Sequence, residues 1–75
     1  MPRGVHLTTR QRYRLKQERE RRLLSLEEAA KKGGIHAVTL SRWETGTTLP
    51  SRTKLSYYLR SLGLSRTEIA SYVKE

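Results

Sequence analysis

Among the places in this 75-residue chain where a hydroxyl residue is followed three positions later by Gln or Glu, three stand at the start of an expected helical segment. In this pattern, the capping box, the hydroxyl accepts a hydrogen bond from the first turn of a helix, and the Gln or Glu side chain accepts one from the backbone N–H of the hydroxyl residue. Each box therefore predicts the start of a helix. The boxes are Thr8 to Gln11, Ser25 to Glu28 and Ser65 to Glu68.

Glycine and serine mark the remaining helix boundaries. Residues 33–34, both glycine, end the second helix, and Gly46 ends a third helix over about residues 37–45, because glycine readily adopts the left-handed conformation that follows a last helical turn. Ser51 precedes a fourth helix, in which apolar residues recur at helical spacing until Gly63. No segment alternates with the period of two that is typical of a half-buried strand. The expected fold class is therefore all-α, with five short helices.

Basic residues are concentrated at the N-terminal end of the chain. The chain has 16 Lys and Arg against seven Asp and Glu, a formal charge of +9, and eight of the basic residues lie within residues 1–22. Such a charge on a small domain repels itself unless a polyanion binds. Nucleic acid is the first candidate, an anionic membrane surface is the second, and a solvated face that keeps the protein soluble is the alternative. The first helix, to about Arg22, has a thin apolar face, essentially Leu15 with Leu23 beyond it.

The sequence offers little to catalysis or to metal binding. Cysteine is absent, and the two histidines, His6 and His36, are too far apart for the spacing of a metal site. The serines are explained as helix caps, and a chain this short has no room for a deep substrate cavity. No apolar run approaches the roughly 18 residues of a membrane span, and no signal peptide is evident. These features predict a cytoplasmic protein that is not an enzyme and has no cofactor, metal, membrane or small-molecule partner.

The most informative stretch covers residues 24–50. Leu40 and Trp43 fall on one face of the expected third helix, whereas Val38 and Arg42 fall on the opposite face. Core packing does not explain an outward valine. The outward valine is explained if this face of the helix meets thymine methyl groups in a major groove while Arg42 reaches a guanine edge there. A single stray valine on the surface is the alternative explanation.

The same stretch resembles the lambda-repressor-like (Cro-type, XRE) helix-turn-helix family. The family pattern runs Leu-Ser/Thr-Gln-x-x-Leu-Ala, a glycine turn, a helix ending Ile-Ser-x-Trp/Leu-Glu-x-Gly, and then a proline. The helices before and after also fit, so the resemblance covers about residues 9–73. The positions that match in register are Leu24, Ser25, Ala30, Gly34, Ile35, Leu40, Ser41, Trp43, Glu44, Gly46 and Pro50.

The resemblance implies a five-helix domain with the helix-turn-helix at about residues 25–45 and the third helix in the major groove of double-stranded DNA. It also implies a structural ion pair between Arg19 in the first helix and Glu44 at the end of the third. The residues expected to read bases are Ala37, Val38, Arg42 and His36. The residues expected to contact phosphate are Ser25, Thr39, Thr45, Thr47 and Thr48.

Three departures from the family pattern bear on this contact map. Leu26 stands where the family has a Gln that contacts phosphate and braces the reading helix, and leucine can make neither contact. Ala29 and Gly33 stand at two positions where leucine is usual, which removes volume from the core. The large Trp43 is the expected filler of that volume.

These features together predict a transcriptional regulator, most simply a repressor that binds an inverted-repeat operator as a homodimer. One reading helix covers only about 4–5 base pairs, so a specific site needs two copies roughly 34 Å apart on one face of the DNA. The subunits are expected to meet through the loop at Thr48, Leu49 and Pro50 and through Leu64, Ile69, Tyr72 and Val73. Inward packing of all these apolar residues, above all Tyr72 and Val73, is the open alternative. An antitoxin-like module for a protein partner and a small basic RNA-binding protein are the alternative functions.

Two segments are expected along the chain. Residues 1–7 form a flexible basic arm, in which Arg3 is placed to follow a minor groove. Residues 8–75 form the helix-turn-helix domain.

Overall fold

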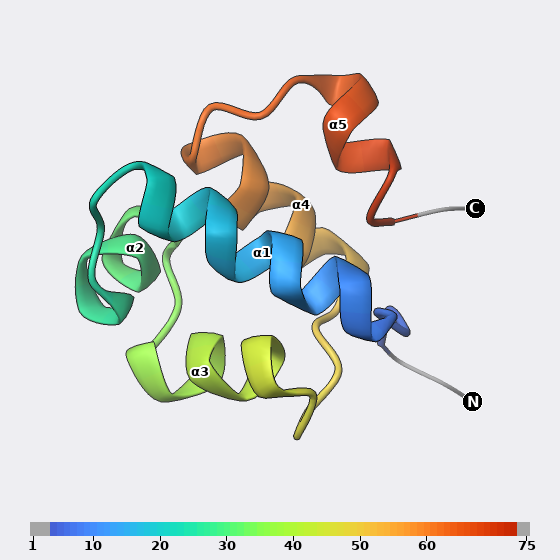
Figure 1. The fold of residues 1–75 in the computed structure, drawn as a ribbon, viewed down its shortest axis with the longest axis horizontal. Coiled ribbons are helices and arrows are strands. Elements are labelled where there is room, and N and C mark those ends of the chain that lie inside the picture. The colour runs from blue at the N-terminus through green and yellow to red at the C-terminus, as the bar shows by residue number, and fades with distance from the viewer. Residues whose placement is uncertain (1–3, 74–75) are drawn as a thin grey trace.

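Five helices and no strand make up residues 4–73, the part of the chain that the computed structural model describes (Figure 1). The all-α prediction with five helices is confirmed. The helices are α1 (Thr9–Arg21), α2 (Leu26–Gly33), α3 (Ala37–Thr45), α4 (Arg52–Ser61) and α5 (Arg66–Ala70).

The three capping boxes predicted from the sequence form in full. At the start of α2, the Glu28 N–H donates to Ser25 Oγ at 3.1 Å, and the Ser25 N–H donates to Glu28 Oε1 at 2.9 Å. Hydrogen bonds from the backbone N–H and the side chain of Ser25 stabilise the Glu28 carboxylate and hold the pKa of Glu28 below its ordinary value. Gly34 and Gly46 close α2 and α3 in the left-handed conformation, with φ of 71° and 86°. The turn between α2 and α3 is thereby limited to residues 34–36.

Helix α3 lies at one edge of the bundle and α5 lies at the opposite edge, with α1 and α4 between them (Figure 1). The inner side of α3 packs on α1 and α2, whereas α5 packs on α4. The centre of the core is formed by residues with no exposed surface, Leu15, Leu40, Leu55, Tyr58 and Leu59. This arrangement leaves the outer side of α3 uncovered by the described chain.

The apolar face of α1 ends earlier than predicted. Leu23 is 90% exposed and has a φ of 59°, so the prediction that it extends this face is wrong. The helix stops at Arg21, and the left-handed turn at Leu23 directs its side chain into solvent. The next residue, Leu24, packs against the core in its place.

The core volume that Gly33 leaves is occupied by Tyr58, which approaches from α4. Trp43, the expected filler, packs edge-on against that tyrosine, with ring centroids 6.0 Å apart and planes at 76°. This is a favourable arrangement for two aromatic rings. Burial raises the pKa of the Tyr58 hydroxyl, which has no hydrogen-bond partner among the described residues.

The apolar residues of the C-terminal region pack inward. None of them is more than 9% exposed, so the prediction that they form a subunit contact is wrong. They are buried because α5 folds back onto α4 and covers them within the same chain. The residues concerned are Leu64, Ile69, Tyr72 and Val73.

Part of the segment predicted as an arm packs on the loop between α3 and α4. The Val5 N–H donates to Pro50 O at 2.7 Å, and Leu7 is buried. Gly4 lies directly against the side chain of Leu49. Arg3, the residue expected to follow a minor groove, lies outside the described residues. None of the five helices is long and apolar enough to cross a bilayer.

Candidate nucleic-acid interface

The C-terminal end of α3 is tied to α1 by an ion pair. Arg19 Nε and Nη2 donate to the two carboxylate oxygens of Glu44 at 2.9 and 3.1 Å. The Arg19 Nη1 also donates to Leu24 O at 2.9 Å, which links the pair to the segment before α2. The two side chains are only 9% and 6% exposed, and the hydrogen bond to Glu44 raises the pKa of Arg19. The pair to which the family resemblance assigned a structural role is therefore buried between α1 and α3.

A second arginine of α1, Arg12, covers Gly46, the C-cap residue of α3. A β-carbon at Gly46 would lie 2.8 Å from Arg12 Cζ, so the guanidinium rests on the backbone of Gly46. The Arg12 Nη1 donates to Leu7 O at 3.0 Å, which holds the guanidinium in place. A cation at this end of α3 also interacts favourably with the helix dipole. Arg12 and Arg19 together fix the orientation of α3 on the bundle.

The outer face of α3 carries most of the residues expected to read bases. Val38 is 59% exposed, and Arg42 is exposed one turn later on the same side. His36 is exposed at the N-terminal cap, where its side chain makes no capping hydrogen bond, and Ala37 is half-buried. On the inner face, Leu40 and Trp43 are buried, so the two faces of α3 divide as the sequence indicates.

A family model described as helix-turn-helix matches residues 15–69, from the middle of α1 into α5. The chain belongs to the lambda-repressor-like helix-turn-helix family. No curated protein and no solved structure matched the chain. In this helix-turn-helix regulator, α2 and α3 are the two helices of the DNA-binding motif, and α3 is the recognition helix.

The dimensions of the recognition helix suit a major groove. An α-helix with its side chains is roughly 10–12 Å in diameter, which matches the roughly 12 Å width of the major groove in B-form DNA. Residues 4–73 bring together no group of three His, Cys, Asp or Glu side chains that could hold a metal ion.

The residues expected to contact phosphate lie mainly beyond the two ends of the recognition helix. Thr45 Oγ1 and Thr47 Oγ1 are 3.1 Å apart at its C-terminal end, and the N–H groups of Thr47 and Thr48 donate to Arg42 O at 2.9 and 3.4 Å. Ser25 lies near its N-terminal end, where the serine caps α2. Thr39 is half-buried within the helix. The exposed hydroxyls thus flank the outer face of α3 on both sides.

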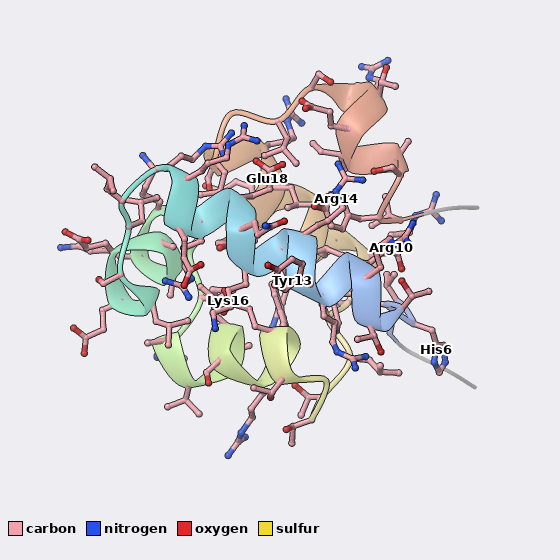
Figure 2. All side chains as sticks on the ribbon, viewed as in Figure 1. His6, Arg10, Tyr13, Arg14, Lys16 and Glu18 are labelled. Carbon is pink, nitrogen blue, oxygen red and sulfur yellow. The ribbon has the colours of Figure 1, made fainter. Side chains whose placement is uncertain are left out.

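The N-terminal basic segment is largely committed to contacts within the helix-turn-helix fold. Arg12, Arg19 and Arg22 each donate to a backbone carbonyl, at Leu7, Leu24 and Leu62 respectively. Figure 2 shows Arg14 directed from α1 toward α5, where its guanidinium carbon lies 5.9 Å from the ring centroid of Tyr72. Lys16 instead lies on the side of α1 that faces α3 (Figure 2). The charge of this segment therefore overstates the number of cations available to DNA.

Sequence reasoning missed the role of Leu26 in this surface. Its side chain lines a shallow groove between the first turns of α2 and α3, opposite Ala37 and Val38. The sequence showed that Leu26 replaces a polar residue, but it did not show that three apolar side chains from two helices meet there. The apolar character of Leu26 and Val38, at two motif positions that the family resemblance assigns to DNA contact, was the available indication.

Proposed function

We propose that this protein is a cytoplasmic, sequence-specific repressor that binds a short inverted repeat in double-stranded DNA as a homodimer. The observation that carries the proposal is the division of α3 into two faces. Its inner face is buried and held by the Arg19–Glu44 pair, whereas its outer face presents Val38 and Arg42 to solvent. A rigid helix with an exposed arginine and an exposed valine suits direct reading of a major groove. The protein acts without a cofactor, a metal or a small-molecule ligand.

The proposed contacts follow the placement of the side chains. Arg42 donates two hydrogen bonds to O6 and N7 of a guanine, the commonest specific contact in a major groove. The other base contacts come from His36, Ala37 and Val38, which occupy the first turn of α3 and its cap. The phosphate contacts position the helix and come from Ser25, Thr39, Thr45, Thr47 and Thr48.

A dimer supplies the specificity that one recognition helix lacks. A contact area of one helix is too small for a unique site in a genome, whereas two copies on successive turns double the number of base pairs that are read. The loop between α3 and α4 is the proposed subunit contact, because Leu49 is 44% exposed there beside the DNA-facing end of α3. Repression results where the operator overlaps a promoter.

Selection of bound duplexes from a random DNA pool tests this function. The expected product is an inverted repeat whose half-sites are centred about 10 base pairs apart. The selected duplex should then bind at least 1,000-fold more tightly than a scrambled duplex, the usual order of such preferences at physiological salt. Enrichment of no sequence, or equal binding of the two duplexes, contradicts the proposal. A selection with structured RNA in place of DNA tests the RNA-binding alternative directly.

A further inference from the structure

The groove between the first turns of α2 and α3 has apolar walls on a DNA-facing surface. Leu26 forms the α2 side, and Ala37 and Val38 form the α3 side. Leu26 and Ala37 also pack partly on the core, which anchors them, whereas Val38 is 59% exposed. The remaining lining residues are Ser25, Glu27 and Ser41. Exposed apolar surface of this kind gains free energy when another apolar group covers it.

The two walls of the groove are held at a fixed separation. The capping box at Ser25 sets the start of α2, and Gly34 closes α2 in the left-handed conformation. The Ile35 N–H donates to Ala30 O at 2.9 Å, which draws the start of α3 back onto α2. The groove is therefore preformed, so a group that enters it does not have to order the surrounding backbone.

The major groove of DNA offers one apolar group to such a site, the C5-methyl group of thymine. The other groups by which the base edges are distinguished are hydrogen-bond donors and acceptors, which would lose water against the apolar walls of this groove. A phosphate is disfavoured for a second reason, because Glu27 is the charged residue of the lining and is an acid. Val38 and Arg42 are one helical turn apart on the same face, so the groove continues the surface that is proposed to contact guanine.

We propose that this groove reads the C5-methyl group of a pyrimidine next to the base pair contacted by Arg42. Leu26, Ala37 and Val38 are then specificity-determining residues. Because leucine stands at position 26, where the family has a polar residue, a phosphate-contacting position becomes a methyl-reading one. This inference rests on the proposed DNA-binding function. It requires that thymine and 5-methylcytosine, which share the methyl group, be favoured over uracil and cytosine, which lack it.

Binding to chemically altered copies of the selected operator tests the inference. Each thymine is replaced in turn by deoxyuridine, which removes the methyl group and leaves the hydrogen-bonding edge unchanged. At one or two positions in each half-site the affinity should fall about fourfold, the effect of one buried methylene-sized group. The same change in both half-sites should lower it about 15-fold. Where a C·G pair replaces the T·A pair at that position, methylation of the cytosine at C5 should recover about fourfold.

Variants of the protein assign the effect to the groove. Val38→Ala, at an exposed position, should reduce the ratio of thymine to uracil affinity toward one, and Leu26→Ala should do the same. Leu23→Ala removes an equally apolar side chain that is 90% exposed and does not line the groove, and it should leave the ratio unchanged. Unfolding midpoints of the three variants establish that each is folded under the binding conditions.

The outcomes separate the inference from the function on which it rests. Sequence-specific binding with no uracil effect at any thymine overturns the methyl-reading groove and leaves the repressor proposal intact. A uracil effect that persists unchanged in the Val38→Ala variant overturns the assignment to this groove. Failure to select any duplex overturns both.

Discussion

Gly33, at the end of α2, lies with its Cα against the phenol ring of Tyr58 in α4. A β-carbon at residue 33 would be 2.6 Å from Tyr58 Cδ1 and 3.3 Å from Tyr58 Cα. The ring has no room to retreat, because Tyr58 is fully buried and Trp43 packs against it. Glycine at this position therefore allows α2 and α4 to approach closely.

Gly33→Ala should destabilise the protein by about 1–3 kcal/mol, the usual effect of overpacking a filled core. The loss should exceed the gain of up to about 1 kcal/mol that alanine brings to a helix over glycine. Urea denaturation followed by circular dichroism measures the net change in the free energy of unfolding. Lys32→Ala, at the exposed neighbouring position, is the matched control and should stay within about 0.5 kcal/mol of the parent. A Gly33→Ala protein at least as stable as the parent would contradict the close contact.

The helix boundaries could be predicted from the sequence because caps are local. The Thr8, Ser25 and Ser65 boxes depend on residues three positions apart, and all three are present. The packing of Gly33 on Tyr58 could not be predicted, since it joins residues on different helices. Periodicity indicated the apolar side of the fifth helix, but it did not show that α4 within the same chain covers that side.

The candidate site likewise contains features that could be predicted from the sequence and features that could not. The exposed positions of Val38 and Arg42 follow from helical periodicity, whereas the Arg19–Glu44 pair came from resemblance to a family. Charge counting overstated the free cations, because a sequence does not show which arginines donate to backbone carbonyls. The groove at Leu26 required the relative placement of two helices, and that placement depends on a three-residue turn whose geometry the sequence only outlines.

Loss of either partner of the Arg19–Glu44 pair should destabilise the fold strongly. Arg19→Ala or Glu44→Ala leaves a buried charge without its partner, and each should cost about 3–5 kcal/mol. The double variant should cost less than the sum of the two single variants, because it leaves neither charge stranded. Chemical unfolding of all four proteins gives the coupling energy. Strictly additive effects would show that the two side chains do not interact in solution.

Arg42→Ala should weaken binding to the selected operator by about 1–3 kcal/mol and relax the preference at one base pair of each half-site. Truncation removes the two hydrogen bonds to guanine but no buried contact, so the fold should be unaffected. Titrations on the operator and on a scrambled duplex measure the change. Arg66→Ala, an exposed arginine of α5 at the opposite edge of the molecule, should leave both affinities close to the parent values. An equal loss on both duplexes would place Arg42 on phosphate.

The salt dependence of binding should reflect the cations that the fold leaves available. With about four phosphates neutralised per subunit, the logarithm of affinity should fall against the logarithm of salt concentration with a slope of about −3 to −4 per subunit. Engagement of all eight basic residues before Leu23 would give a slope of about −7. A slope that steep would mean that Arg12, Arg19 and Arg22 leave their carbonyl partners on DNA, and a flat response would contradict nucleic-acid binding.

Of the two surfaces that the sequence predicted for a subunit contact, the loop between α3 and α4 remains, because the C-terminal residues are buried. Leu49 is 44% exposed at its tip, and Gly4 packs against one side of the leucine. A charge at this position would lie against its own copy across a two-fold axis, because a symmetric contact places the same patch on both subunits. Repulsion at that point should weaken the dimer without disturbing the recognition helix.

Leu49→Glu should therefore reduce cooperative two-to-one binding to the full inverted repeat and leave binding to a single half-site nearly unchanged. Mobility-shift titrations on full-site and half-site duplexes separate the two effects, whether or not the free protein is a monomer. Leu23→Glu introduces the same charge at an exposed leucine remote from the loop, and it should retain the cooperativity of the parent. Hyperbolic, one-to-one binding of the parent protein to the full site would exclude the dimer.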